Sequence, residues 1–373
     1  MEFRSLTAAS AVIAVGAMTI GAGVTVASVI RPATRAHRTA VVMRAYHRRA
    51  DYNTGLSTGL NTGLNTGLNT GRGDLAASDG TRVNAGICTA PSAYRKLAVR
   101  VSADIQHALH GRADNHAATV YDAVTGVSCH TNGGRHFDSA SIVKAIILAA
   151  LLRRHQESGT PLSSFEEREA TLMITQSDND AATDLWDEVG MSGLQHFLDL
   201  AGMKETRLGQ NGYWGLTQVT AHDEMLLLEL LTRPNSVLTA ASRRYQLGLM
   251  ARVIPGQRWG TPAGAPRTVT VHVKNGWLPE SGGWHINSIG AFTGQNRNYL
   301  IAVLTDDNKS EQYGIDTIQA VARAVHRDLN ESSLVPAARF AANVAPSVTQ
   351  SSPSPWAVVP ALPTPAASPA PAP

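Results

Sequence analysis

The spacing of hydrophobic and polar positions changes along residues 86–330. Where hydrophobic residues recur every three or four positions the pattern predicts helices, and where they alternate or form short β-branched runs between turn residues it predicts strands. The predicted helices cover 92–110, 139–155, a region within 161–200, 221–231 and 311–329. The predicted strands cover 117–124, 127–130, 268–274, 287–293 and 299–305.

The order of these elements predicts the fold class. The first two strands form a hairpin that turns at Thr125-Gly126, and the other three lie near the end of the domain. An all-helical insertion separates the two groups, so one antiparallel sheet has to be assembled from both ends of the chain. We therefore expect an α+β fold (an α/β sandwich), in which helices flank an antiparallel sheet.

The two ends of the chain differ in composition from this domain. Residues 6–30 carry no charged side chain over 25 positions, and as a helix they would span about 37 Å, enough to cross a membrane. We interpret residues 1–30 as either a cleaved signal peptide or an N-terminal membrane anchor. Residues 31–85 hold a basic stretch and an Asn-Thr-Gly-Leu repeat and are predicted to be a disordered linker. The Pro-, Ala- and Ser-rich tail, residues 331–373, is also predicted to be disordered.

Charge is unevenly distributed between these regions. The formal net charge is +3, but nine Arg and four acidic residues give residues 1–85 a charge of +5, which leaves −2 for residues 86–373. A slightly acidic domain argues against nucleic-acid binding, which needs a basic face. The apolar leader predicts an extracytoplasmic protein, secreted or anchored to the outer face of the cell membrane. Six Arg between residues 31 and 49 argue the other way, because positive flanks are retained in the cytoplasm.

Cys88 and Cys129 are the two cysteines of the chain. In an exported domain they would form a disulfide that closes a loop of about 40 residues and stabilises the fold by about 2–4 kcal/mol. The alternative is a pair of buried, reduced thiols. Neither lies in a Cys-x-x-Cys pair, and we interpret the His-x-x-His of His107 and His110 as part of a surface helix, so no metal site is expected.

One Ser-x-x-Lys pattern occurs in the chain, Ser141-Ile142-Val143-Lys144. Residues three apart share a helix face, so the Lys144 amine would lie beside the Ser141 hydroxyl. A serine hydroxyl becomes a nucleophile when a neighbouring base takes its proton, and a lysine in a partly apolar site can be that base. For this pattern alone, the alternative is a serine at a helix start and a lysine that extends to solvent.

Two further patterns follow. Ser177-Asp178-Asn179 is the one Ser-Asp-Asn of the chain, and Lys274-Asn275-Gly276, at the end of a predicted strand, is the one Lys-x-Gly. The chain has five Lys, and two of them stand in these patterns. Together with the element order across 86–330, this succession resembles the penicillin-recognising active-site serine enzymes, most nearly class A β-lactamases and related D,D-peptidases.

The resemblance implies a role in acyl transfer for four residues. Ser141 would attack the substrate carbonyl and become acylated, and Lys144 would accept or relay its proton. Ser177 would hand a proton to the departing nitrogen, while Asn179 would bind the substrate amide and help to fix Lys144. Ser141, Lys144 and Ser177 are thus the candidate catalytic residues.

Four more residues would contact the substrate if the resemblance holds. Lys274 would supply positive charge for a substrate carboxylate, and Asn275 stands where the family places a Thr or Ser hydroxyl. Gly276 would let the substrate lie against the strand edge, and the backbone N–H of Trp277 would complete an oxyanion hole with that of Ser141. The implied partner is a β-lactam or a peptide ending in D-Ala-D-Ala, bound by a monomer without metal or organic cofactor.

The stretch between the second and third patterns departs from class A enzymes, which carry a Glu-x-x-Leu-Asn loop whose Glu activates the deacylating water. Here the loop, residues 208–216, has no carboxylate. Gln210 or Asn211 could hold a water without deprotonating it, and we interpret Glu205 just upstream as a solvated charge at a helix end. Loss of a general base costs about 10²–10⁴-fold in its step, so a β-lactam would acylate faster than it is released.

Three hypotheses from different classes follow. The leading one is an exported serine hydrolase with an acyl-enzyme mechanism and slow β-lactam turnover, or alternatively a D,D-peptidase. The second is a receptor that binds penicillin or peptidoglycan without turnover. The third is a structural wall protein with a vestigial site, which penicillin would not label.

Overall fold

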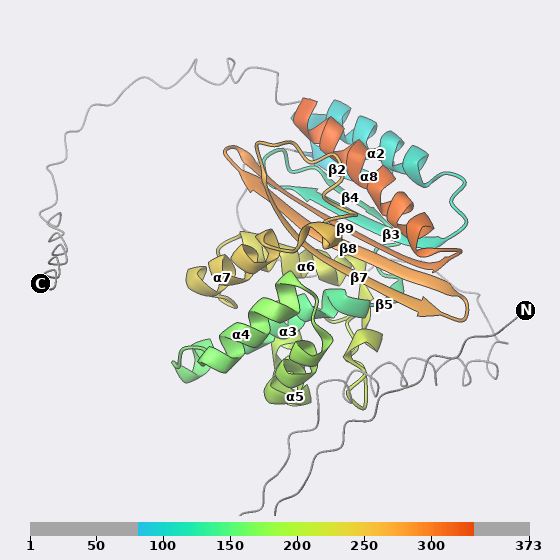
Figure 1. Cartoon of the computed structure of the whole chain (residues 1–373). Coiled ribbons are helices and arrows are strands. Elements are labelled where there is room, and N and C mark those ends of the chain that lie inside the picture. The colour runs from blue at the N-terminus through green and yellow to red at the C-terminus, as the bar shows by residue number, and fades with distance from the viewer. Residues whose placement is uncertain (1–80, 332–373) are drawn as a thin grey trace, which may run out of the picture.

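The computed structural model describes residues 81–331, which form a sheet with helices on both faces (Figure 1). The predicted leader, nearly all of the predicted linker and the predicted tail lie outside these residues. Among the described residues, no helix combines the length and apolar character needed to cross a membrane.

Seven antiparallel strands form the main sheet, in the order β1-β2-β4-β3-β9-β8-β7. Strand β3 pairs with β9 along its whole length, from Asn115 opposite Asp306 to Asp122 opposite Tyr299. The sheet is therefore assembled from both ends of the chain, which confirms the predicted α+β class. The strands are β1 (Arg82–Ala85), β2 (Cys88–Pro91), β3 (Asn115–Asp122), β4 (Ser128–Thr131), β7 (Thr270–Glu280), β8 (Gly283–Gly294) and β9 (Arg297–Asn308).

Helices cover both faces of this sheet. Helices α2 (Arg95–Leu109) and α8 (Glu311–Glu331) pack against each other on one face, and α6 (Ala221–Thr232) packs on the other, with the helical insertion beyond it (Figure 1). The insertion consists of α3 (Val143–Ser158), α4 (Ser164–Thr175), α5 (Asn179–Ala201) and α7 (Ala240–Ala251).

Helix α3 is the centre of the helical insertion. All ten residues from Val143 to Leu152 are buried, so the helix is enclosed on every side instead of showing one apolar stripe. It ends at Gly159, which adopts the left-handed conformation (φ 68°) that commonly closes a helix. This enclosure fixes the position of Lys144 in the first turn of α3.

The structure joins Cys88 and Cys129 in a disulfide. The two residues are direct partners across β2 and β4, and both are buried. The bond ties the N-terminal strand pair, β1 and β2, to the rest of the sheet.

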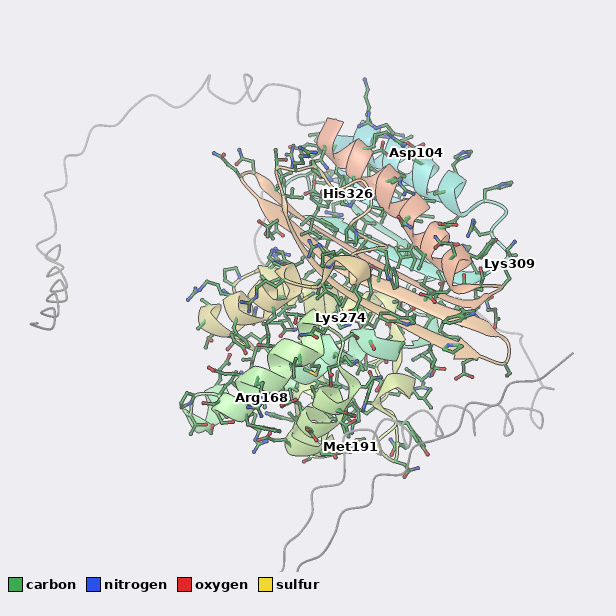
Figure 2. All side chains as sticks on the ribbon, in the orientation of Figure 1. Asp104, Arg168, Met191, Lys274, Lys309 and His326 are labelled. Atoms are coloured by element: carbon green, nitrogen blue, oxygen red, sulfur yellow. A yellow bond between two sulfur atoms is a disulfide. The ribbon has the colours of Figure 1, made fainter. Side chains whose placement is uncertain are left out.

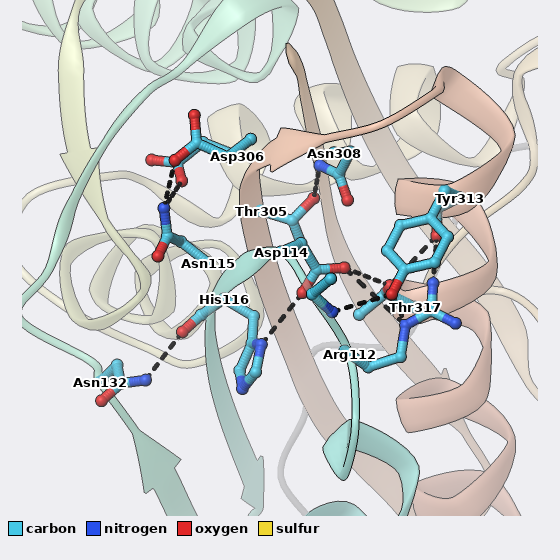
Figure 3. Close-up of polar contacts among 12 residues, drawn as sticks. Arg112, Asp114, Asn115, His116, Asn132, Thr305, Asp306, Asn308, Tyr313 and Thr317 are labelled. Atoms are coloured by element: carbon cyan, nitrogen blue, oxygen red, sulfur yellow. Dashed lines mark hydrogen bonds and ion pairs between the residues drawn. The ribbon is translucent and has the colours of Figure 1, made fainter. Parts of the chain in front are cut away.

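A polar cluster anchors α8 to the start of β3 (Figure 3). Arg112 donates to Thr317 Oγ1 (2.7 Å) and to the carbonyl of Tyr313 (2.6 Å), and its guanidinium lies 3.7 Å from the centre of the Tyr313 ring. Thr317 donates in turn to Asp114 Oδ2 (2.6 Å). Because Asp114 is buried, these contacts satisfy a carboxylate that would otherwise be costly to desolvate.

The structure differs from the predicted elements in several places, among them strand β2, which was not predicted. Strand β1 lies inside the segment predicted as linker, so the folded domain begins earlier than residue 86. Strand β7 extends to Glu280, six residues past its predicted end. Helix α7 and the small second sheet of β5 (His136–Asp138) and β6 (Gln218–Thr220) were not predicted. All of these are short or carry too few hydrophobic positions to show a period.

His326 of α8 is buried against the main sheet (Figure 2). Its Nε2–H donates to the carbonyl of Thr261 (2.8 Å), and its Nδ1 accepts from the Tyr299 hydroxyl (2.8 Å). The ring also packs edge-on against Phe292, with centroids 4.5 Å apart. Burial lowers the pKa of His326 to about 4, although the bond to Thr261 opposes this. The folded protein therefore holds this imidazole neutral.

This lowered pKa predicts a loss of stability in mild acid. The unfolded chain takes up a proton on His326 near its ordinary pKa of about 6.5, whereas the folded protein does so near 4. The contribution of His326 to the free energy of unfolding is complete above about pH 6.5. It falls by about 3 kcal/mol as the pH drops to 4. Urea unfolding at pH 4–7 should show that His326→Gln loses this part of the pH dependence. The exposed His110→Gln should keep it, and parallel curves for all three proteins would contradict the prediction.

Candidate active site

The three sequence patterns meet at the junction of the main sheet and the helical insertion. Ser141 lies in a 3₁₀ turn (Ala140–Ile142) ahead of α3, Ser177 lies between α4 and α5, and Lys274 lies on edge strand β7. Lys144 Nζ donates to Ser141 Oγ (3.0 Å) and Ser177 Oγ (3.2 Å), and Lys274 Nζ donates to the same Ser177 Oγ (3.0 Å). Figure 2 shows Lys274 between the sheet and the insertion.

Lys144 is fully buried, and polar oxygen atoms surround its Nζ. Besides the two hydroxyls, two further acceptors lie within hydrogen-bond distance of its Nζ, the carbonyl of Ser177 (2.7 Å) and Asn179 Oδ1 (2.7 Å). Burial, and then the charge of Lys274, hold the pKa of Lys144 well below its usual range, while the charge of Asp178 acts in the opposite direction. A lysine in this state is readily neutral, which is the form that can take a proton from Ser141.

Lys274 is the second buried lysine of the site. It is 1% exposed, and its Nζ donates to Ser177 Oγ and to the carbonyl of Asn275 (2.8 Å). Burial lowers the pKa of Lys274 to about 7. Its charge therefore depends on pH near neutrality.

Asp178 is structural. Its side chain caps the N-terminus of α5 by accepting from the backbone N–H of Ala181 (2.9 Å). This agrees with the sequence-based interpretation, which gave Asp178 no catalytic role. The cap fixes the position of Asn179 in the first turn of α5.

Two residues of the site have a strained backbone. Ala140 (φ 47°) directly precedes Ser141, and Ser177 has φ 59°; both lie in the left-handed region, which costs a residue other than glycine energy. Surrounding bonds hold these turns. Ser139 N–H donates to the carbonyl of Thr217 (2.8 Å), and Lys144 binds the Ser177 carbonyl.

Gly276 has a role that the sequence did not reveal. A β-carbon on Gly276 would lie 2.8 Å from both the carbonyl oxygen of Ser139 and the backbone nitrogen of Ser141. Only a glycine lets β7 lie directly against the turn that carries Ser141. The prediction gave Gly276 contact with substrate, whereas the structure uses its missing side chain for contact with the nucleophile turn. Trp277, whose N–H was predicted for the oxyanion hole, follows at once on the same strand.

Asn275 is placed differently from its predicted role. Its Nδ2 donates to the carbonyls of Gln257 and Trp259 (both 2.9 Å), and the residue is 1% exposed. Both amide hydrogens are thus committed to backbone carbonyls, whereas the resemblance placed Asn275 where the family has a Thr or Ser hydroxyl that contacts substrate. Instead Asn275 fastens the preceding chain segment to β7.

Trp214 lies closer to the reacting groups than the sequence indicated. Its indole ring centre is 4.7 Å from Lys144 Nζ, and its Nε1–H donates to Thr183 Oγ1 (3.2 Å). The residue is buried in a 3₁₀ turn (Trp214–Leu216) within the loop that has no carboxylate. From the sequence, Trp214 was expected near the cleft and interpreted as core or rim packing unless it stacks on a substrate. A cation–π contact needs no spacing rule, so no sequence signal marks it.

Part of this chain matches a known protein family. Residues 167–329 match the family model described as the β-lactamase enzyme family. The chain has no match among curated proteins.

Three solved structures illustrate the structural likeness. The β-lactamase of Xanthomonas campestris pv. campestris is 20% identical with a TM-score of 0.54, over 62% of this chain and 98% of that chain. That of Sphaerobacter thermophilus is 21% identical with a TM-score of 0.54, over 64% and 98%. A class A representative from Bacteroides cellulosilyticus is 16% identical with a TM-score of 0.56, over 63% and 99%. These structures share the fold of this chain, and the family match over residues 167–329 agrees with the resemblance drawn from the sequence.

The anchoring role of Asn275 predicts a loss of stability on substitution. Asn275→Ala leaves the carbonyls of Gln257 and Trp259 without their buried donor, so the free energy of unfolding should fall by about 1–3 kcal/mol. Gln257→Ala is the matched control, because it keeps the Gln257 carbonyl and removes only an exposed bond to the Gln176 carbonyl. Urea unfolding measures the change in the free energy of unfolding for both variants. Equal, small changes would show that Asn275 is not an anchor.

Proposed function

We propose that this β-lactamase-like serine hydrolase is exported and forms an acyl-enzyme through Ser141 with β-lactams or with peptidoglycan-type peptide amides, and that it releases β-lactam acyl groups slowly. The observation that carries the proposal is the environment of Lys144. This base contacts the Ser141 hydroxyl on one side, and on the side of residues 208–216 it meets the ring of Trp214 instead of a carboxylate.

Acylation follows from the contacts of Ser141. Neutral Lys144 takes the proton of Ser141 Oγ over 3.0 Å as that oxygen attacks the substrate carbonyl. The developing oxyanion meets the backbone N–H groups of Ser141 and Trp277. Ser177 Oγ then gives its proton to the departing nitrogen and is resupplied by Lys144, which lies 3.2 Å away.

Deacylation lacks an equivalent partner. Hydrolysis of the ester needs a water deprotonated beside Ser141, and residues 208–216 supply an indole where class A enzymes supply a carboxylate. The nearby Asp178 is committed to the start of α5. Without a dedicated base we expect the acyl-enzyme to last about 10²–10⁴-fold longer than with one.

The proposal of export has two supports. The uncharged stretch of residues 6–30 is typical of a signal peptide or anchor. The disulfide between Cys88 and Cys129 is of a kind that persists in oxidising compartments.

Covalent labelling tests the function. The full chain, incubated with a fluorescent penicillin, should acquire one label per molecule, and Ser141→Ala should acquire none. A chromogenic cephalosporin should give a burst of one equivalent followed by a slow steady state. Ser141→Ala is close in shape to the native residue, so retained unfolding behaviour would show that the fold is intact.

Each of the other outcomes supports a different function for this protein. Label without any steady state supports a receptor, and rapid turnover shows that a deacylation base is present after all. Slow β-lactam release together with multiple turnovers of a D-Ala-D-Ala peptide supports a D,D-peptidase. Labelling of Ser141→Ala at the native level would mean that Ser141 is not the nucleophile.

The pKa of Lys274 predicts a pH dependence for labelling. Because this pKa is lowered to about 7, Lys274 is charged below pH 7 and loses its charge as the pH rises through 7. The second-order rate constant for a penicillin with a free carboxylate should therefore fall by about tenfold for each pH unit above 7. A penicillin methyl ester, which lacks that charge, should show no such fall. Identical profiles for the two reagents would exclude Lys274 as the carboxylate contact.

A further inference from the structure

A second group of chemically reactive side chains lies at the base of the loop that carries Trp214. Glu205 Oε2 lies 3.7 Å from His222 Nδ1, and His222 Nδ1 lies 3.4 Å from Asp223 Oδ1. All three ligand atoms lie within 4.8 Å of one another. In a tetrahedral zinc site with metal–ligand distances of about 2.0–2.2 Å, ligand atoms are about 3.3–3.6 Å apart. Two of the three separations are already close to this value.

The Asp223 carboxylate gives an independent indication of a bound cation. The side chain is 1% exposed, and its Oδ1 has His222 Nδ1 as a neighbour at 3.4 Å but makes no hydrogen bond of good geometry among the described residues. Buried carboxylate oxygens are normally satisfied, because an unpaired one costs free energy. The neighbouring Glu224 is also buried, and neither of its carboxylate oxygens has a hydrogen-bond partner among the described residues.

The remaining bonds of these ligands hold them in place. Asp223 Oδ2 accepts from the backbone N–H of Glu205 (2.9 Å) and from Thr206 Oγ1 (2.8 Å). Glu205 Oε2 accepts from Thr220 Oγ1 (3.0 Å). Such second contacts fix ligand orientation before a metal binds. Glu205 and His222 are 44% and 61% exposed, so an ion can enter from solvent.

We propose that Glu205, His222 and Asp223 bind a divalent transition-metal ion, with Zn²⁺ the best match to one imidazole and two carboxylates. Imidazole favours zinc and its neighbours over Mg²⁺ and Ca²⁺, which prefer oxygen ligands. Water would fill the fourth position of a tetrahedral ion. The sequence gave no sign of this site, because 17 positions separate Glu205 from His222 and no metal motif has that spacing.

The position of the site indicates what the metal would do. Glu205 precedes the loop that contains Trp214, and His222 and Asp223 follow it in the first turn of α6. Two backbone hydrogen bonds between Arg207 and Gln218 (both 2.9 Å) already close this loop. A metal ion would add a second closure outside the first and restrict the segment that holds Trp214 against Lys144.

Zinc titration of the full chain tests the proposal. The untagged protein is stripped with a chelator, dialysed and titrated with ZnCl₂ in a calorimeter, and CoCl₂ is used in parallel because tetrahedral Co²⁺ absorbs visible light. We expect one strong Zn²⁺ site per chain and a rise in melting temperature on binding. His222→Ala and Glu205→Gln should each weaken binding at least about tenfold and abolish the zinc-dependent rise.

Two controls separate a metal site from a simple ion pair. His196 is an exposed histidine 2.9 Å from a single carboxylate, that of Glu157, so His196→Ala should leave zinc binding unchanged. MgCl₂ and CaCl₂ should not compete with zinc at equal concentration. Zinc binding of equal strength in the native protein and His222→Ala would overturn the proposal, as would strong binding of Mg²⁺ or Ca²⁺ in place of zinc. Penicillin labelling of Ser141 does not depend on this outcome.

Discussion

Two buried lysines share one hydroxyl, and the chemistry of the protein depends on this contact. Lys144 and Lys274 both donate to Ser177 Oγ, over 3.2 and 3.0 Å. Two desolvated ammonium groups this close repel each other, so the pair holds its second proton weakly. Burial is the larger cause of the low pKa of Lys144 and the charge of Lys274 the second. The site therefore favours a neutral amine beside Ser141.

The rest of the domain keeps these two lysines in contact. Lys144 is fixed because α3 is enclosed on all sides, and Lys274 is fixed because β7 lies directly against the turn before Ser141. That approach requires Gly276, and it is accompanied by left-handed backbone at Ala140. Strained conformations persist only where the surrounding structure determines them from several sides. Here sheet, insertion and connecting loops all contribute, which explains why segments far apart in sequence have to fold together.

The sequence predicted the parts of this arrangement that periodic spacing or the order of the elements reveals. Ser-x-x-Lys on one helix turn, and strands β3 and β9 in one sheet, follow from spacing and element order. Helix α7 was missed because two of its four buried residues are polar, Ser242 and Gln246, so it has no clear hydrophobic period. The contacts of Asn275 and Trp214 were missed for another reason. Their partners come from other parts of the chain, and no local pattern encodes which carbonyl or ammonium a side chain will meet.

In the loop between Glu205 and His222, the contacts that hold the backbone are separate from the side chain that faces Lys144. A change of function is therefore possible without a change of fold. The ends of the loop are held by backbone bonds between Arg207 and Gln218 and by the Asp223 carboxylate, none of which involves the residue facing Lys144. The side chain at that place can therefore change without loss of the loop. In the proposed mechanism, an indole there leaves the lysine pair and the nucleophile in place, while the deacylating water has no dedicated base. On that proposal acylation and deacylation depend on different parts of the structure, so one can be lost while the other persists.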